Sequence, residues 1–120
     1  AIDQALALDA RVAGGEAVGP LAGVPVGIKD ITPVGGVRTT YGSPLHADHV
    51  PAEDAEIVAR LRRAGAIVVG KTNTPEFAAG ASTWNDVFGR TRNPWNLALS
   101  AGGSTGGGAA ALQDSCSHAS

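Results

Sequence analysis

The sequence has only one cysteine, Cys116, among its 120 residues. A single thiol excludes an internal disulfide framework and a zinc site built on several thiolates, and it suits a reducing compartment. We therefore expect a cytoplasmic protein. Basic residues are not in excess either, because nine Lys and Arg stand against eleven Asp and Glu, with a formal net charge of −2. This balance gives no positive field for a phosphate backbone, so we expect no direct nucleic-acid partner.

Long apolar stretches are also missing. A membrane-spanning helix needs about 18 or more consecutive apolar residues, and a secretory leader needs a charged start followed by an apolar segment. The sequence has neither feature, so we expect no membrane partner. It is 43% hydrophobic in short segments and contains 17 glycines. This length and composition predict one globular domain.

The short apolar segments predict an α/β fold. Residues 2–12 carry apolar side chains on one face, so we expect a helix that ends at glycines 14–15. Residues 23–28 and 66–70 are β-branched and bounded by glycine, which is typical of buried strands. Residues 54–64 have the apolar spacing of a helix. The order strand, helix, strand indicates that the two strands pair in parallel.

Several residues indicate where these elements begin and end. Asp54 is the expected N-cap of the second helix, and Gly65 is its expected stop. Thr74-Pro75-Glu76 predicts a further helix start, with Thr74 as the cap. Residues 32–51 are rich in proline and glycine, and we expect them to form a long irregular loop.

A glycine-rich segment, residues 100–108, precedes a helix predicted over residues 106–112. Such a loop lets a substrate approach the backbone closely, but it lacks the lysine of a phosphate-binding loop. The absence of a good preceding strand argues against a dinucleotide fold. Residues 102–106 also match the nucleophile elbow G-x-S-x-G, which requires a preceding apolar strand and a distant downstream histidine, whereas only His118 follows. A loop that only permits close packing is a further alternative.

Lys29 stands at the end of the first predicted strand. Burial there favours the neutral amine, which is a usable base, and Ser-Lys pairs can replace Ser-His pairs. Lys71 follows the second strand in the same way, and a lysine that extends into solvent is the alternative for either residue. His46 and His49 share one loop without a distant third ligand, so we expect no metal site there.

Four motifs, in this order along the chain, resemble the amidase signature family. The resemblance covers roughly residues 6–112, and it matches Lys29, and not Lys71, to the family's catalytic lysine. The motifs are GVPVGIKD at 23–30, GAIVVGKTNTPEF at 65–77, RNPWN at 92–96 and GGSTGG at 102–107.

The resemblance implies a mixed β-sheet flanked by helices, of which this chain holds an incomplete part. It also implies a Ser-cis-Ser-Lys triad with Lys29 as the base. Ser104 matches the serine that relays the proton, and the Gly103–Ser104 peptide bond is expected to be cis. Gly102, Gly103 and Thr105 are the expected substrate-binding residues, and the resemblance implies neither a cofactor nor a metal.

The family's attacking serine belongs to a further glycine-rich motif that falls beyond Ser120. We therefore expect an N-terminal fragment that lacks the nucleophile and is inactive alone. We assign residues 1–112 to the family domain and residues 113–120 to an atypical, disordered tail, because the latter do not continue the alanine-rich helix pattern. Thr105 replaces a serine that is common in the family and retains a hydroxyl.

The resemblance implies an amidase that cleaves linear carboxamides to an acid and ammonia or an amine. One alternative is the A subunit of a tRNA-dependent amidotransferase, which releases ammonia from glutamine. Another is a noncatalytic module that uses the same fold for packing or interaction. The expected partner is a small amide substrate, and the resemblance allows the full-length protein to be a homo-oligomer or part of an amidotransferase complex.

Overall fold

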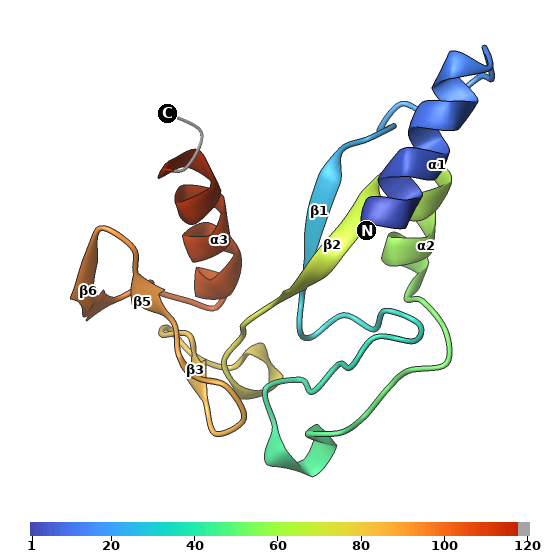
Figure 1. Ribbon diagram of the computed structural model, residues 1–120. Coiled ribbons are helices and arrows are strands. Elements are labelled where there is room, and N and C mark those ends of the chain that lie inside the picture. Colours follow the sequence, from blue (N-terminus) through green and yellow to red (C-terminus); the bar gives the residue numbers. More distant parts are fainter. Residues whose placement is uncertain (118–120) are drawn as a thin grey trace.

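Two parallel strands form the centre of the fold (Figure 1). In the computed structural model, which describes residues 1–117, strand β1 (Pro25–Lys29) pairs with strand β2 (Ile67–Thr72). The register shifts between Val26 and Gly27. The shift lies one residue beyond Pro25, which has no N–H to donate to a ladder.

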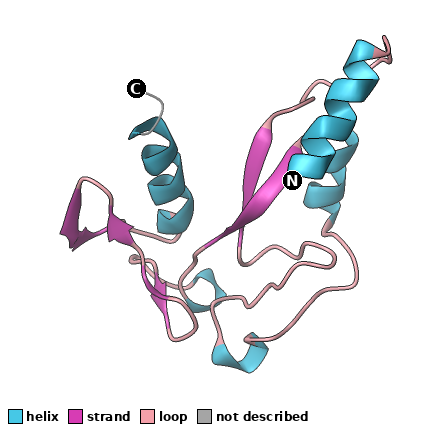
Figure 2. Cartoon of the chain, viewed as in Figure 1, coloured by secondary structure: helices cyan, strands magenta, loops and turns pink. Residues whose placement is uncertain are grey.

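Three helices lie around this strand pair (Figure 2). Helices α1 (Ile2–Ala13) and α2 (Glu56–Arg63) lie on one side of the strands, and α3 (Gly106–Ser117) lies on the other. Helix α3 contacts both strands, and α2 contacts β2. The predicted parallel pair and the helix between its strands are confirmed. None of the helices formed by residues 1–117 is long and apolar enough to cross a membrane.

The apolar core is small. Its buried members are Ile28 of β1, Val58 of α2 and Val34 of the following loop. The partly buried residues packed against them are Val26, Ala55, Leu61 and Val68. This core joins the sheet to α2, whereas no residue of α1 is buried.

Short hairpins and single turns connect β2 to α3. Asn and Gly residues interrupt the apolar pattern in this region, and the sequence did not predict its strands. The described residues form a parallel pair and two separate antiparallel pairs, so the single mixed sheet expected from the family is present only in part. The elements are the 3₁₀ turns η1 (Pro44–His46, within the earlier loop) and η2 (Glu76–Ala78), and strands β3 (Trp84–Asn85), β4 (Gly89–Arg90), β5 (Arg92–Asn93) and β6 (Asn96–Ser100).

The predicted N-cap of α2 is wrong. Ala55 occupies the cap position without a side-chain hydrogen bond. Asp54 instead accepts a hydrogen bond from the Gly35 N–H, 2.8 Å from its Oδ1, and pairs with Arg62 through Oδ2 at 2.9 Å. The carboxylate therefore connects the loop after β1 to α2.

The helix predicted to start at Thr74 is also wrong, because only the single turn η2 forms. Phe77 has a non-helical backbone with φ of 47°. Its N–H donates to the carbonyl of Tyr41 at 2.8 Å, so this backbone group bonds a neighbouring loop and does not continue a helix.

Helix α3 extends five residues beyond the predicted boundary at Leu112. Residues 109–117 contain neither glycine nor proline, so nothing in the local sequence breaks the helix. Residues 113–117 of the predicted tail are thus helical in the structure. Residues 118–120 lie outside the described part of the chain, and the disorder of the tail stays a prediction.

The start of α3 contacts the end of β2 through backbone atoms. A Cβ atom on Gly107 would lie 2.4 Å from the Asn73 amide nitrogen, too close for any real contact. We expect Gly107→Ala to lower the free energy of unfolding by about 1–3 kcal/mol, because the backbone must shift to accept the methyl group. Urea titration of the full-length gene product measures this change.

Gly70→Ala is the matched control. A Cβ at Gly70 meets no atom within 4 Å, and its φ is not positive. This variant should be as stable as the wild type or slightly more stable, because alanine restricts the unfolded chain. Equal losses in the two variants would contradict the close-contact explanation for Gly107.

Candidate functional site

Lys29 and Ser104 meet although 75 residues separate them in the sequence. The Lys29 Nζ donates to the Ser104 Oγ at 2.7 Å and lies 3.2 Å from the Thr105 Oγ1. Lys29 is the last residue of β1, and the two hydroxyls belong to the loop before α3. The two predicted site residues are thus neighbours.

The residue after Lys29 fixes the end of β1. Asp30 is only 2% exposed, and its Oδ2 accepts hydrogen bonds from the N–H and the hydroxyl of Thr40. The Asp30 N–H donates to the carbonyl of Thr72 on β2 at 2.9 Å. These contacts hold the backbone from which the Lys29 side chain extends.

Lys29 has hydroxyl partners and, within the described chain, no salt bridge to a carboxylate. Desolvation lowers the pKa of its amine below 10.5. No neighbouring negative charge opposes this shift, so the neutral form is easier to reach. A neutral amine at this position can accept a proton from the Ser104 hydroxyl.

Lys71 has a different environment, although it also follows buried strand residues. Its Nζ lies 3.4 Å from the Asp30 Oδ1, and it donates to the Thr32 carbonyl and, at 2.9 Å, to the Thr39 Oγ1. Burial lowers the pKa of Lys71, and the negative charge of Asp30 opposes that effect. Lys71 therefore donates to the loop after β1 and not to the loop that carries Ser104.

The serine loop is built from closely packed glycines. The Gly103–Ser104 peptide bond is cis, the geometry expected from the sequence. A Cβ on Gly103 would lie 2.8 Å from the Ala81 carbonyl carbon, and one on Gly106 would lie 2.6 Å from the Thr83 Oγ1. Gly102 has a φ of 76°, a conformation that favours glycine. The glycines therefore permit a backbone path that larger residues would obstruct.

The side-chain amides of Asn73 and the buried Asn85 hold the β3–β4 hairpin beside this loop. Asn85 donates through Nδ2 to the Asn73 Oδ1 at 2.6 Å and to the Thr74 carbonyl at 2.7 Å. Asn73 donates through its own Nδ2 to the Thr91 Oγ1 at 3.0 Å. Asn73 is also the residue whose backbone contacts Gly107, so one asparagine joins the hairpin to α3.

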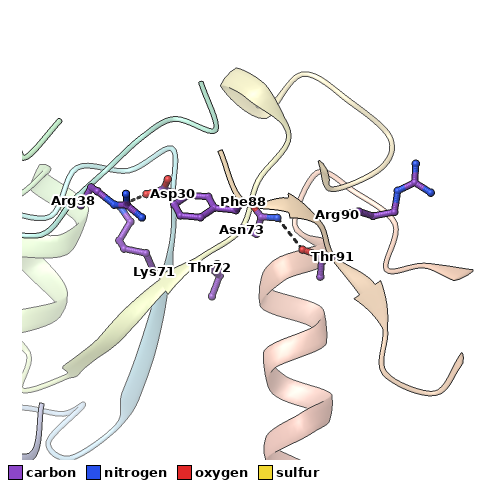
Figure 3. Close-up of a pocket in the computed structure, with 8 residues that line it drawn as sticks. All are labelled: Asp30, Arg38, Lys71, Thr72, Asn73, Phe88, Arg90 and Thr91. Atoms are coloured by element: carbon purple, nitrogen blue, oxygen red, sulfur yellow. Dashed lines mark hydrogen bonds and ion pairs between the residues drawn. The ribbon is translucent and has the colours of Figure 1, made fainter. Parts of the chain in front are cut away.

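A cavity of about 490 Å³ lies at the carboxyl ends of β1 and β2 (Figure 3). Arg38 and Phe88 approach from opposite sides, with the guanidinium carbon 5.0 Å from the ring centroid. Arg90 points away from the other labelled side chains. Neither Lys29 nor Ser104 lines this cavity. The lining residues are Asp30, Arg38, Lys71, Thr72, Asn73, Phe88, Arg90 and Thr91.

His46 and His49 do come together, with ring centroids 5.8 Å apart, and both rings also contact Tyr41. Among the residues that the structure describes, no group of three or more His, Cys, Asp or Glu side chains could hold a metal ion. The histidine pair is an aromatic cluster on the loop after β1.

Known proteins share this arrangement of sequence and fold. The sequence profile of the Amidase family matches residues 1–118. The chain belongs to the amidase signature family. In Acidothermus cellulolyticus, the A subunit of glutamyl-tRNA(Gln) amidotransferase is 51% identical over 112 residues, which are 93% of this chain and 22% of that protein. The chain thus spans about a fifth of the length of its curated amidase relatives.

Solved structures of amidase signature proteins have the same fold. A structure from a vestigial protein complex, solved in work on the origins of an s-triazine catabolic enzyme, has a TM-score of 0.85 and 42% identity over 92% of this chain and 24% of that chain. The peptide amidase from Stenotrophomonas maltophilia has a TM-score of 0.83 and 38% identity over 91% of this chain and 23% of that chain.

Sequence reasoning did not identify Thr83 as a residue of the site. It is fully buried, and it bonds the backbone at both ends of the serine loop. A threonine between Ser82 and Trp84 has no distinctive local pattern, so only the three-dimensional contacts reveal it. Sequence reasoning did select Thr105, but as a substrate-binding residue, and the structure places its hydroxyl beside Lys29.

The two lysines should differ in their effect on stability. Lys71→Met leaves the buried Asp30 carboxylate without its cation, so we expect the free energy of unfolding to fall by about 2–4 kcal/mol. Lys29→Met removes only contacts to hydroxyls and should change it by less than about 1 kcal/mol. Urea titration of both full-length variants at neutral pH tests this difference. A larger loss for Lys29→Met would contradict the scaffold role of Lys71.

Proposed function

We propose that the full-length protein hydrolyses carboxamides and that Lys29 and Ser104 are two members of its catalytic triad. The observation that carries this proposal is the 2.7 Å contact between the Lys29 Nζ and the Ser104 Oγ. Lys29 has a lowered pKa and forms no salt bridge to a carboxylate in the described chain, and both features favour the neutral amine that acts as a base. Membership of the amidase family supports amide C–N bonds as the target.

In this mechanism a second serine, expected beyond residue 120, attacks the amide carbonyl. Its proton passes to the Ser104 oxygen while the Ser104 proton passes to neutral Lys29. The carbonyl carbon gains a bond to the serine oxygen and then loses its bond to nitrogen. The proton returns through Ser104 to the leaving amine. Water hydrolyses the resulting ester, which restores the serine and releases the acid.

Gly102, Gly103 and Thr105 have supporting roles in this proposal. A Cβ at Gly102 would meet no atom within 4 Å, so this glycine leaves open space where a flat amide can approach the backbone. Gly103 lets the loop pack against residues 80–82, which holds that backbone in place. Thr105 gives Lys29 a second hydroxyl partner at 3.2 Å. The proposed substrate is a small amide, and the chemistry uses no cofactor or metal.

A second candidate function is hydrolysis of glutamine as the A subunit of an amidotransferase. The specific observation is the 51% identity to a protein of that kind, compared with 38% to the peptide amidase. In that case the ammonia passes to a partner protein of the same complex. Either function suits the cytoplasm, the compartment that the single cysteine favours.

The activity test uses the full-length product of the gene that encodes this chain. Lys29→Met and Ser104→Ala should each reduce kcat for amide hydrolysis by about 10²- to 10⁴-fold, because each interrupts the proton path. Release of ammonia from glutamine and from simple carboxamides is measured. Arg60→Met is the control, because Arg60 is an exposed cation paired only with Glu56 in the described chain. Unchanged turnover in Lys29→Met with the fold intact would disprove the triad assignment.

The pH dependence tests the protonation state of Lys29. A base must be neutral, so kcat/KM should rise with pH and level off above the pKa of Lys29. Desolvation places that midpoint below 10.5. Steady-state rates between about pH 5 and 10 measure this profile. A rate that falls continuously as the pH rises would show that Lys29 acts as a cation and not as a base.

A further inference from the structure

Thr83 connects both ends of the loop that carries Ser104. Its N–H donates to the Gly102 carbonyl at 2.8 Å, before the serine. Its Oγ1 accepts from the Gly106 N–H at 2.9 Å, after the serine. Ser104 and Thr105 therefore belong to a short segment whose two ends bond to one residue.

Thr83 is itself held firmly. It is 0% exposed, and its carbonyl accepts from the Thr91 N–H at 2.9 Å. Its N–H, carbonyl and hydroxyl groups are thus all paired. Thr91 in turn accepts a hydrogen bond from Asn73, so Thr83 is part of the rigid contact between the β3–β4 hairpin and the end of β2.

The first amide of α3 needs an acceptor from outside the helix backbone. Thr105 occupies the N-cap position, because its carbonyl accepts from the Ala109 N–H. A threonine there commonly accepts from the second or third helical amide with its own hydroxyl, and not from the first. The first amide, that of Gly106, bonds Thr83, and the Thr105 hydroxyl lies 3.2 Å from the Lys29 Nζ.

We propose that Thr83 is a positioning residue that supplies the acceptor for the first amide of α3 and so holds Thr105 where its hydroxyl contacts Lys29. By bonding Gly102 and Gly106, Thr83 also fixes the position of Ser104 relative to the amine. Thr83 does not itself touch Lys29 or Ser104. Its link to turnover rests on the proposed amidase function, whereas its effect on Lys29 does not.

Thr83→Val removes the acceptor and keeps the shape of the side chain. The Gly106 N–H then loses its acceptor, and the start of α3 is no longer tied to the segment before β3. Thr105 and Ser104 can then move away from Lys29, which disturbs the contacts of the amine. Thr83→Ser keeps the hydroxyl and should rescue both geometry and activity.

Thr74→Val is a matched control within the chain. Thr74 is also 0% exposed, but its Oγ1 has no hydrogen-bond partner among the described residues. Loss of that hydroxyl removes a buried polar atom and no hydrogen bond. A difference between Thr83→Val and Thr74→Val therefore reports the hydrogen bond to Gly106 and not burial of a methyl group.

The first measurement is independent of amide turnover. NMR titration of the lysine Cε signals in the full-length protein follows Lys29, whose signal is assigned by its absence in Lys29→Met. Desolvation lowers the pKa of Lys29, and a loop that moves away exposes the amine to water, so we expect this pKa to rise toward its ordinary value in Thr83→Val. It should remain at the wild-type value in Thr83→Ser and Thr74→Val. An unchanged Lys29 titration in folded Thr83→Val would overturn the proposal.

The second measurement is steady-state amide hydrolysis. Thr83→Val should lower kcat by about tenfold or more and leave KM within about twofold, with Thr83→Ser near wild type. If the wild type shows no amidase activity but the Lys29 titration still changes, the proposed function fails and the positioning role stands. If Lys29→Met abolishes turnover and Thr83→Val does not lower it, the positioning role fails and the function stands.

A third variant at position 83 keeps the test possible if Thr83→Val does not fold. If Thr83→Val does not fold, Thr83→Cys replaces it, because a thiol is a weak acceptor of similar size. Its Lys29 titration should move in the same direction by a smaller amount. A Thr83→Cys protein that folds and has the wild-type titration would overturn the proposal as well.

Discussion

The first turn of α3 lies so close to the end of β2 that a side chain at Gly107 would collide with the backbone of Asn73. This contact brings the start of the helix to the edge of the sheet where Lys29 ends β1. Gly103 and Gly106 allow the same close approach toward the segment before β3. The contact between Lys29 and Ser104 depends on these backbone contacts, because a larger separation would move the hydroxyl away from the amine.

Lys29 and Lys71 have similar positions along their strands but different hydrogen-bond and ion-pair partners. Lys71 lies against Asp30, and this pair joins the loop after β1 to the sheet. Lys29 has only hydroxyl neighbours in the described chain. A carboxylate would stabilise the charged amine of Lys29, whereas desolvation leaves the pKa of this amine lowered. Lys71 is therefore paired with the Asp30 carboxylate, whereas the Lys29 amine has no ion pair in the described chain.

Much of the fold could be predicted from local patterns. The helix at residues 2–13 and the parallel strands follow from apolar periodicity and glycine boundaries. The sequence predicted caps at Asp54 and Thr74 that do not form, because contacts with loops distant in sequence decide how the chain runs at both positions. Asp54 bonds the loop after β1, and the turn after Thr74 bonds Tyr41. The short hairpins were missed because their strands have no apolar alternation.

The sequence by itself determined the family, since four ordered motifs carry that information, and the same motifs led to the prediction of Lys29 and Ser104 as site residues. The positions of glycine in the sequence also indicated where the predicted strands and helices end. Only the tertiary structure decided which groups face these residues: that Thr105 bonds Lys29, and that Thr83 bonds the loop on both sides of Ser104. The physical reason is that a hydroxyl has several potential partners within reach of its own segment, and packing of distant segments selects among them.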